Sequence, residues 1–235
     1  MRTAALVMCL LLVGTGFVGA EGLNPYWERI GAGLPNSVVV MENVYERYDG
    51  LVNIGTRTPV LWGLTSPELQ EEINAAIASS VQGWIEEVTT AAESFAADDD
   101  FEFAVHFLPF QLYIEYETKY NRGGLLSLVL TVYEFLGGAH GMTYLIPLNV
   151  DLTTGRYLTF ADLFPDGDSR RRMAEVVDAR IKAEPEIFFI DAFDEAMFHP
   201  EQHFYFADGE IVVFFDLYDI APYASGIQEF SLSVN

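Results

Sequence analysis

Two apolar runs bracketed by glycines, between residues 121 and 151, constrain this fold more than any other stretch. The runs Leu125–Leu136 and Met142–Val150 are rich in β-branched and aromatic residues, which favour strands. Gly137-Gly138-Ala139-His140-Gly141 separates them, and three glycines in five residues imply positive φ angles or a close approach by another backbone. The pattern predicts two long neighbouring strands, central to a sheet, joined by a tight turn.

The first 20 residues have the pattern of a secretory signal, with Arg2 before an apolar stretch and the small residues Val18-Gly19-Ala20 at its end. We expect cleavage near Ala20 and export to the periplasm or the medium. The apolar stretch is too short for a membrane span, so none is expected in the mature chain. Cys9 is the only cysteine and lies in the signal, so core packing without disulfides must hold about 215 mature residues.

Charge is the strongest bulk property of the chain. It has 12 basic and 35 acidic residues and a formal charge of −23, which becomes −24 without Arg2. Such a surface repels nucleic acid and anionic lipid and attracts cationic partners, so nucleic acid is excluded as a partner. Two kinds of explanation of the acidity stay open. One is a cationic protein partner, and the other is simple solubility or a salty habitat where acidic surfaces are common.

The first half of the mature chain predicts strands around one long helix. Residues 38–48 and 51–62 read as strands joined at Asp49-Gly50, with Pro59 marking an edge or an end. Ser66 and Pro67 open a helix whose apolar positions form one continuous stripe until the acidic run 98–100. Alternating strands follow at 101–106 and 110–117, ahead of the two glycine-bracketed strands.

The second half changes character. A helix capped by Asp168 or Ser169 and ending near Ala183 is predicted, followed by a shorter helical segment over residues 185–198. Asp208-Gly209 marks a hairpin between apolar runs, and residues 230–234 form a last short strand.

The elements together predict an α+β fold. We expect a mostly antiparallel sheet with a long helix packed on one face, and a second helical segment before a C-terminal hairpin. The predicted organisation is a signal peptide (1–20), a leader that lies over the domain (21–37), an N-terminal half of β-β-α-β-meander type (38–152) and a C-terminal half (153–235) packed with it as one unit.

Several stretches, taken in order, resemble a known pair of domains. They are Pro59–Leu64 with Leu69-Gln70 and Ile73–Ile77, then Gly137–His140, Asn149–Gly155, Leu158–Phe164, Phe204–Phe206 and Tyr218–Gly226. This order resembles the paired uncharacterised domains in the extracellular part of RsiV-type anti-sigma factors, and the same pair ahead of the catalytic domain in PdaC-type peptidoglycan deacetylases.

The resemblance implies a non-catalytic α+β module outside the membrane, which in the anti-sigma factors is a receptor for lysozyme. It covers residues from about 38 to 233 and implies no catalytic residues for this chain. The expected partner is therefore a lysozyme-like cationic protein or peptidoglycan. Opposite charge would steer a cationic lysozyme toward so acidic a surface.

The candidate binding residues are Gly137, Gly138, His140, Tyr218 and Tyr223. His140 suits a catalytic base by its ordinary pKa, but the neighbouring sequence names neither a nucleophile nor an orienting acid. The alternative is that His140 hydrogen-bonds backbone within the turn. Tyr218 and Tyr223, with Phe230, form either an exposed aromatic surface for sugar or protein, or a closed part of the core.

His199 and His203 are weak candidates for a metal site. Two histidines four apart lie on one face of a helix, and Glu195 or Glu201 would supply a third ligand. Pro200 lies between them and opposes helical spacing. We therefore predict no metal or other cofactor.

The function predicted from these observations is an exported, non-enzymatic envelope module that binds a protein or cell-wall glycan. The rival is an envelope hydrolase that uses His140, and a third alternative is a purely structural periplasmic domain.

Overall fold

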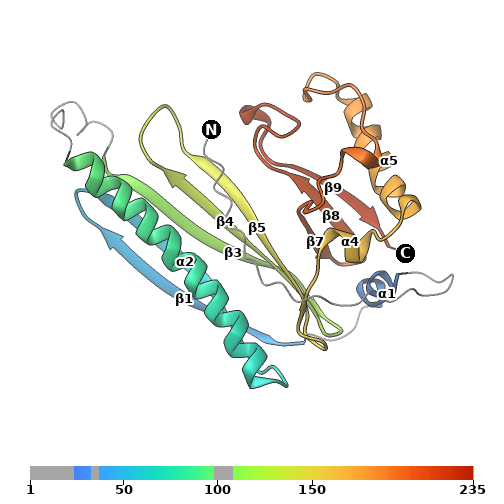
Figure 1. Ribbon diagram of the computed structural model, residues 1–235, viewed down its shortest axis with the longest axis horizontal. Helices are drawn as coiled ribbons and strands as arrows, with labels where there is room; N and C mark the ends of the chain where they lie inside the picture. Colours follow the sequence, from blue (N-terminus) through green and yellow to red (C-terminus); the bar gives the residue numbers. More distant parts are fainter. Residues whose placement is uncertain (1–23, 33–36, 98–107, 235) are drawn as a thin grey trace.

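The computed structural model describes residues 24–32, 37–97 and 108–234. It contains a six-stranded sheet in the order β1-β2-β3-β4-β5-β6 and a three-stranded sheet in the order β7-β8-β9. Figure 1 shows the long sheet with α2 across it, and the small sheet with α4 and α5 beside it. The predicted α+β class with a mostly antiparallel sheet is confirmed, because β2–β3 is the only parallel pair among the described strands.

The elements follow one another along the chain as two groups. The first comprises α1 (Pro25–Gly31), β1 (Val39–Tyr48), β2 (Val52–Trp62), α2 (Pro67–Ala96), β3 (Phe110–Arg122), β4 (Leu125–Phe135) and β5 (Met142–Asp151). The second comprises β6 (Arg156–Tyr157), α4 (Phe160–Leu163), α5 (Gly167–Ala183), η2 (Glu195–Met197), β7 (Phe204–Ala207), β8 (Glu210–Phe215), η3 (Tyr223–Ser225) and β9 (Gln228–Ser233).

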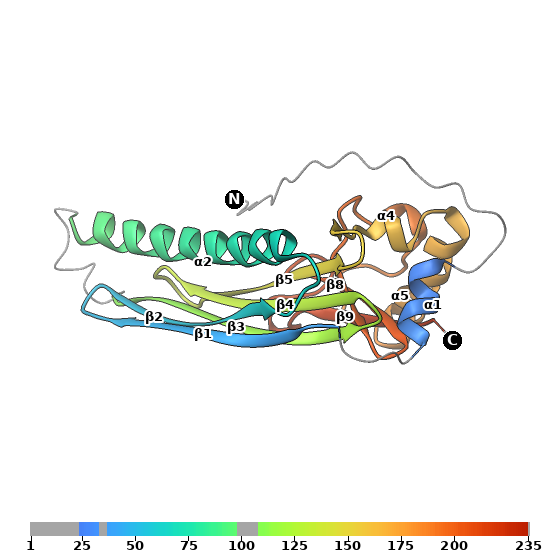
Figure 2. The same cartoon turned by 90° about the horizontal axis from the view of Figure 1, so that it is seen from below.

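The long helix α2 forms where the sequence predicts it. The Ser66 side chain accepts a hydrogen bond from the Leu69 amide, and Pro67 occupies the first helical turn. The predicted apolar stripe is buried against the sheet through Ile73, Ile77, Val81, Trp84, Val88 and Ala92. These side chains share one core with alternate residues of β2, β3 and β4. Figure 2 shows α2 running along one face of the long sheet.

The α2 helix also explains the parallel pair. Parallel strands need a long crossover, and α2 lies in the connection from β2 to β3. Pairing of β2 with β3 stops at Thr56, so Pro59 has a strand neighbour on one side only, as its missing N–H requires. Beyond that point the side-chain amide of Asn74 accepts from the Leu61 N–H at 2.8 Å and donates to its carbonyl at 3.0 Å. A helix side chain thus replaces the missing strand.

The second half forms its own core between α5 and the small sheet. The predicted hairpin is confirmed as β7–β8, and the predicted last strand is β9. The cap of α5 is Asp166, whose side chain accepts from the Ser169 amide at 2.7 Å, and not Asp168 or Ser169. The predicted helical segment over residues 185–198 is wrong in extent: only the 3₁₀ turn η2 forms there, because Phe188, Phe193 and Phe198 enter the core from an irregular path.

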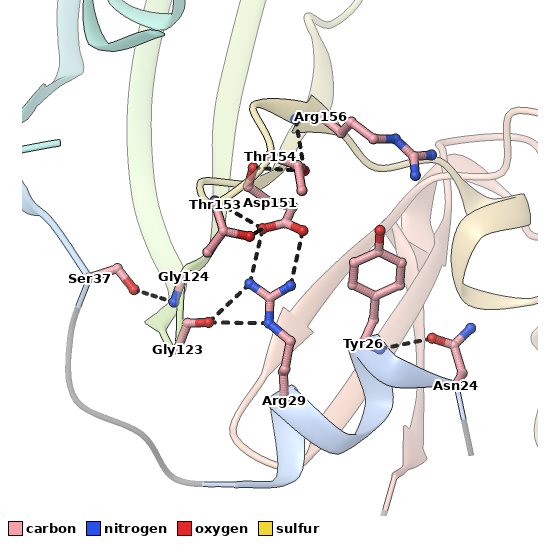
Figure 3. A network of polar contacts seen from close by, with 10 residues as sticks. All are labelled: Asn24, Tyr26, Arg29, Ser37, Gly123, Gly124, Asp151, Thr153, Thr154 and Arg156. Atoms are coloured by element: carbon pink, nitrogen blue, oxygen red, sulfur yellow. Dashed lines mark hydrogen bonds and ion pairs between the residues drawn. The ribbon is translucent and has the colours of Figure 1, made fainter. Parts of the chain in front are cut away.

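The leader is more than a covering segment. Residues 25–31 form α1, and its Trp27 and Ile30 are 3% and 2% exposed within the core of the second half. Arg29 donates two hydrogen bonds of 3.0 Å to the Asp151 carboxylate and two more to the Gly123 carbonyl (Figure 3). The helix therefore joins the turn before β4 and the end of β5 to the second half.

A buried polar bridge connects the two sheets. Ser127 of β4 donates to Asn149 of β5 at 2.6 Å, and Asn149 donates to the Phe204 carbonyl at 2.8 Å. The Phe206 amide donates back to Ser127 at 3.1 Å. Val129 and Leu145, on the sheet face away from α2, pack with Tyr205 and Phe214 of the small sheet. The division at residues 152/153 and the packing of the two halves as one unit stay predictions.

The long helix ends at Ala96, just before the acidic run 98–100 as expected. Two expectations lie outside the described residues: the signal with its cleavage near Ala20, and the strand over 101–106. Among the residues that are described, no helix is both long and apolar enough to cross a membrane.

Candidate functional site

The glycine turn between β4 and β5 has both features that its sequence predicts. Gly137 and Gly138 have φ angles of 83° and 108°, which glycine adopts without strain. Gly141 is closely approached: a Cβ there would lie 2.5 Å from the Tyr133 ring and 2.6 Å from the Glu134 carbonyl. The turn is therefore held in one shape, with His140 exposed at its end.

His140, Tyr218 and Tyr223 come together at this turn, and we call them the aromatic cluster. The His140 ring stacks on Tyr223 with 4.2 Å between ring centroids, and Tyr218 lies 5.8 Å from Tyr223. The Tyr223 hydroxyl donates to the Gly141 carbonyl at 2.9 Å. The same carbonyl lies 2.9 Å from His140 Nδ1, so the backbone of the turn fixes both rings.

The aromatic residues do not all have the same environment: one is part of the core, and the other two are at least partly exposed. Phe230 is buried in the core of the second half, whereas Tyr218 is 50% exposed and Tyr223 is half-buried. Tyr218 also has a φ of 73°, the only positive value for a non-glycine residue in the described chain. Tyr218 is thus held exposed by a backbone conformation that is disfavoured for a non-glycine residue.

Two acidic residues belong to the same segment as Tyr218. Asp216 and Asp219 flank Tyr218 in the chain, and burial together with the neighbouring Asp216 charge raises the pKa of Asp219. The Asp216 carboxylate lies 3.3 Å from His203 Nδ1, and this hydrogen bond raises the pKa of His203. Asp216 Oδ1 is buried and has no hydrogen-bond partner in the described parts of the chain.

His199 and His203 have different hydrogen-bond partners. The Gln202 amide donates to the His199 carbonyl at 3.0 Å, which makes a turn around Pro200 and not a helix. His199 Nδ1 accepts from the Glu201 amide at 3.1 Å, while His203 pairs with Asp216. The residues that the structure describes contain no group of three His, Cys, Asp or Glu side chains placed to hold a metal ion.

Sequence reasoning missed the acids that lie beside the cluster. Asp216 ends the apolar run of β8, and its charge also acts on Tyr144 of β5, whose pKa burial raises to about 12. Tyr144 donates to Glu134 at 3.1 Å, and burial raises the pKa of Glu134. The available signal was a carboxylate directly after the apolar run of residues 211–215, where a buried charge needs a partner.

Two family profiles match the chain in tandem. The profile described as "Deacetylase PdaC" matches residues 46–143, and the one described as "Protein of unknown function (DUF3298)" matches residues 161–235. The aromatic residues Tyr218 and Tyr223 lie in the second region, and His140 lies near the end of the first.

A curated relative and two solved structures are also similar. The "Anti-sigma-V factor RsiV" of Bacillus subtilis (strain 168) is 25% identical over 189 residues, which is 77% of this chain and 62% of the relative. The chain thus spans less than two thirds of that protein.

The solved structures share the fold. A member of the DUF3298 family from Bacteroides fragilis superposes with a TM-score of 0.66 at 19% identity, covering 84% of this chain and 91% of that one. A DUF3298 family protein from Pseudomonas aeruginosa PAO1 gives a TM-score of 0.52 at 19% identity, covering 87% and 92%. The resemblance stated from the sequence is confirmed: a region similar to the PdaC profile is followed by a region similar to the DUF3298 profile, and the chain is similar to the anti-sigma factor RsiV.

Proposed function

We propose that this protein is an exported, non-catalytic module of the cell envelope that binds a cationic, lysozyme-like protein through the aromatic cluster. One observation carries the proposal. His140, Tyr218 and Tyr223, drawn from two distant segments, form a stack in which His140 and Tyr218 are exposed, and Asp216 and Asp219 lie in the same segment as Tyr218. Aromatic rings next to carboxylates suit lysine and arginine side chains, which bind to ring faces and pair with acids.

The charge of the whole chain supports a protein partner over a glycan. A formal charge of −23 attracts a cationic protein at long range, whereas a sugar chain gains nothing from it. Cell-wall glycan remains the second candidate because stacked rings also fit the apolar faces of sugars.

The proposal places no reaction at this surface. His140 Nδ1 is engaged by a backbone carbonyl and its ring by Tyr223, an arrangement that fixes the ring and suits a contact residue. The name of the first profile refers to a deacetylase, but the resemblance places the matched region ahead of the catalytic domain in those proteins. The rival proposal is an envelope hydrolase with His140 as base.

The test is association with hen lysozyme, measured by calorimetry with the full mature chain. Tyr218→Ala is expected to weaken binding at least about tenfold, as loss of an interface anchor does. Trp62→Ala, which removes another exposed ring at the end of β2, is the matched control and is expected to leave binding unchanged. Association is expected to survive His140→Ala.

The alternatives give different results. Turnover of peptidoglycan that disappears in His140→Ala would favour the hydrolase. Retention on insoluble peptidoglycan without lysozyme binding would favour the glycan. Binding of neither would contradict the proposal and favour a structural domain.

A further inference from the structure

The outer edge of the long sheet is unusually open. Strand β1 pairs with β2 on one side and is the first strand of the sheet order, so within the described part of the chain its other edge has no strand neighbour (Figure 1). Five of its ten residues are large, apolar or aromatic and exposed: Val39, Met41, Val44, Tyr45 and Tyr48. Proteins usually protect such edges with charged side chains, above all lysine, with proline or with a bulge. Strand β1 has no lysine, proline or bulge, and its charged residues are Glu42, Glu46 and Arg47.

A cavity of about 200 Å³ lies next to this edge. It opens on the face away from α2, because seven of its nine lining residues, all except Thr56 and Ile114, pair across β1, β2 and β3 with side chains on that face. Gly55 lies at its base: a Cβ there would be 3.1 Å from the Tyr48 hydroxyl and 3.3 Å from the Tyr113 ring. Tyr48 and Tyr113, 58% and 36% exposed, therefore form two aromatic walls over a glycine floor.

The charges around the cavity are unbalanced. Arg57 lines the cavity but already forms an ion pair with Glu42, with 3.0 Å between the guanidinium nitrogen and the carboxylate oxygen. Glu46 and Glu115 also line the cavity, and within the described residues neither forms an ion pair. Two aromatic walls and two unpaired carboxylates suit a long aliphatic stem that ends in a cation, which is the chemistry of lysine and arginine.

We propose that β1 and this cavity bind an extended basic segment of a partner protein. The segment adds a strand to the free edge of β1, and one of its lysine or arginine side chains enters the cavity between Tyr48 and Tyr113. Main-chain hydrogen bonds to an exposed edge supply affinity, and a pocket for alternate side chains supplies specificity. A second copy of this chain is disfavoured because two chains of charge −23 repel each other.

The cavity and the aromatic cluster are connected by side chains. Tyr113 stacks on Tyr133 at 6.2 Å, and Tyr133 covers Gly141, whose carbonyl accepts from Tyr223. The inference rests on the proposed function in one respect, the cationic nature of the partner, but it concerns a different surface that binds by different contacts.

The experiment uses a fluorescein-labelled peptide of alternating lysine and threonine, about ten residues long, matching the length of β1. Binding to the mature chain is measured by fluorescence anisotropy. The double variant Glu46→Gln, Glu115→Gln keeps the shape of the cavity and is expected to weaken binding at least about tenfold. Glu71→Gln with Glu175→Gln removes the same charge at exposed helical positions and is expected to change it less than about twofold.

A second readout locates the peptide. Amide exchange over residues 39–48 is expected to slow when the peptide binds, because the free edge of β1 becomes hydrogen-bonded. Tyr113→Ala, which removes one wall, is expected to weaken binding as the charge variant does. Equal losses in the two charge variants, or protection confined to residues 216–226, would overturn the inference. So would dimers joined through β1 in ultracentrifugation, or a chito-oligosaccharide that competes for the cavity.

The two proposals fail separately. If lysozyme binding depends on Tyr218 while peptide binding ignores Glu46 and Glu115, the inference is wrong and the proposed function stands. If the peptide binds through the cavity and lysozyme does not bind at all, the proposed function is wrong and the inference stands.

Discussion

Arg29 and Asp151 form the ion pair with the least solvent exposure on its carboxylate in the described chain, with side-chain exposures of 25% and 4%. Burial alone would raise the pKa of Asp151, but hydrogen bonds from Arg29 and Thr153 outweigh it, so the pKa lies below its ordinary value. The network ties the leader helix to the turn after β3 and the end of β5 (Figure 3).

Arg29→Met is expected to lower the free energy of unfolding by about 2 kcal/mol at neutral pH, since it leaves a buried carboxylate without its cation. A lowered folded pKa contributes stability above the unfolded value near 4, and that contribution is lost as the pH falls through the folded pKa. The difference between variant and wild type should therefore shrink in acid. Urea unfolding measures both.

Arg57→Met is the control, because its exposed pair with Glu42 is expected to contribute less than about 1 kcal/mol. If Arg29→Met and Arg57→Met lower the free energy of unfolding equally, the burial of Asp151 does not strengthen its ion pair with Arg29.

His203 predicts a pH dependence with the opposite sign. Its pKa is raised, first by the hydrogen bond to Asp216 and further by Asp219 and Glu201 nearby. The resulting stability is present below the unfolded value of about 6.5 and is lost as the pH rises through the folded pKa. His203→Gln should therefore lower the thermal midpoint at about pH 6 more than at about pH 8.5. A constant difference across that range would contradict the His203–Asp216 pairing.

At the scale of elements, α1 is the clearest surprise. Its seven residues are too few to show a helical period, and isolated helices of that length do not form in water. The helix depends on Trp27, which donates to the Leu163 carbonyl at 3.0 Å and packs on Phe164. No pattern within the leader could reveal partners that lie more than a hundred residues later in the chain.

Trp27→Ala is therefore expected to destabilise the protein by about 3–4 kcal/mol, the cost of removing a buried indole and leaving a cavity. Chemical denaturation measures it. A decrease in the free energy of unfolding of less than about 1 kcal/mol would mean that the leader only covers the domain, because substitutions of exposed residues have effects of that size.

Long, regular elements were predictable, and their pairings were not. The stripe of α2, its Ser66 cap and the alternation in β3 are local signals, and the structure confirms them. The division into two sheets and the parallel β2–β3 pair depend on which strands meet, which one sequence does not encode locally. The turn glycines were predictable for the same local reason, whereas the meeting of His140 with Tyr223 depends on the tertiary fold.

The whole molecule has two main cores joined by shared contacts. Trp84 belongs to the core under α2 and Trp27 to the core of the second half, while Ser127 and Asn149 bridge the sheets between them. We expect the halves 38–152 and 153–235 to unfold as one unit, because separating them would leave this buried bridge unsatisfied.

Fluorescence of two variants tests this cooperativity. Trp84→Phe leaves Trp27 as the buried reporter, and Trp27→Phe leaves Trp84. If the halves unfold together, each variant should give the same denaturation midpoint by fluorescence and by circular dichroism. Fluorescence and circular dichroism midpoints that disagree within either variant would show that the halves unfold separately.

The most direct test of an acidic binding module is the salt dependence of its affinity for hen lysozyme. Between about 20 and 300 mM salt, the dissociation constant of the wild type is expected to rise steeply, because screening removes long-range attraction. Tyr218→Ala should shift the whole curve to weaker binding without changing its slope, since that ring contributes contact and not charge. A flat dependence on salt, or a Tyr218→Ala curve identical to the wild type, would contradict the account.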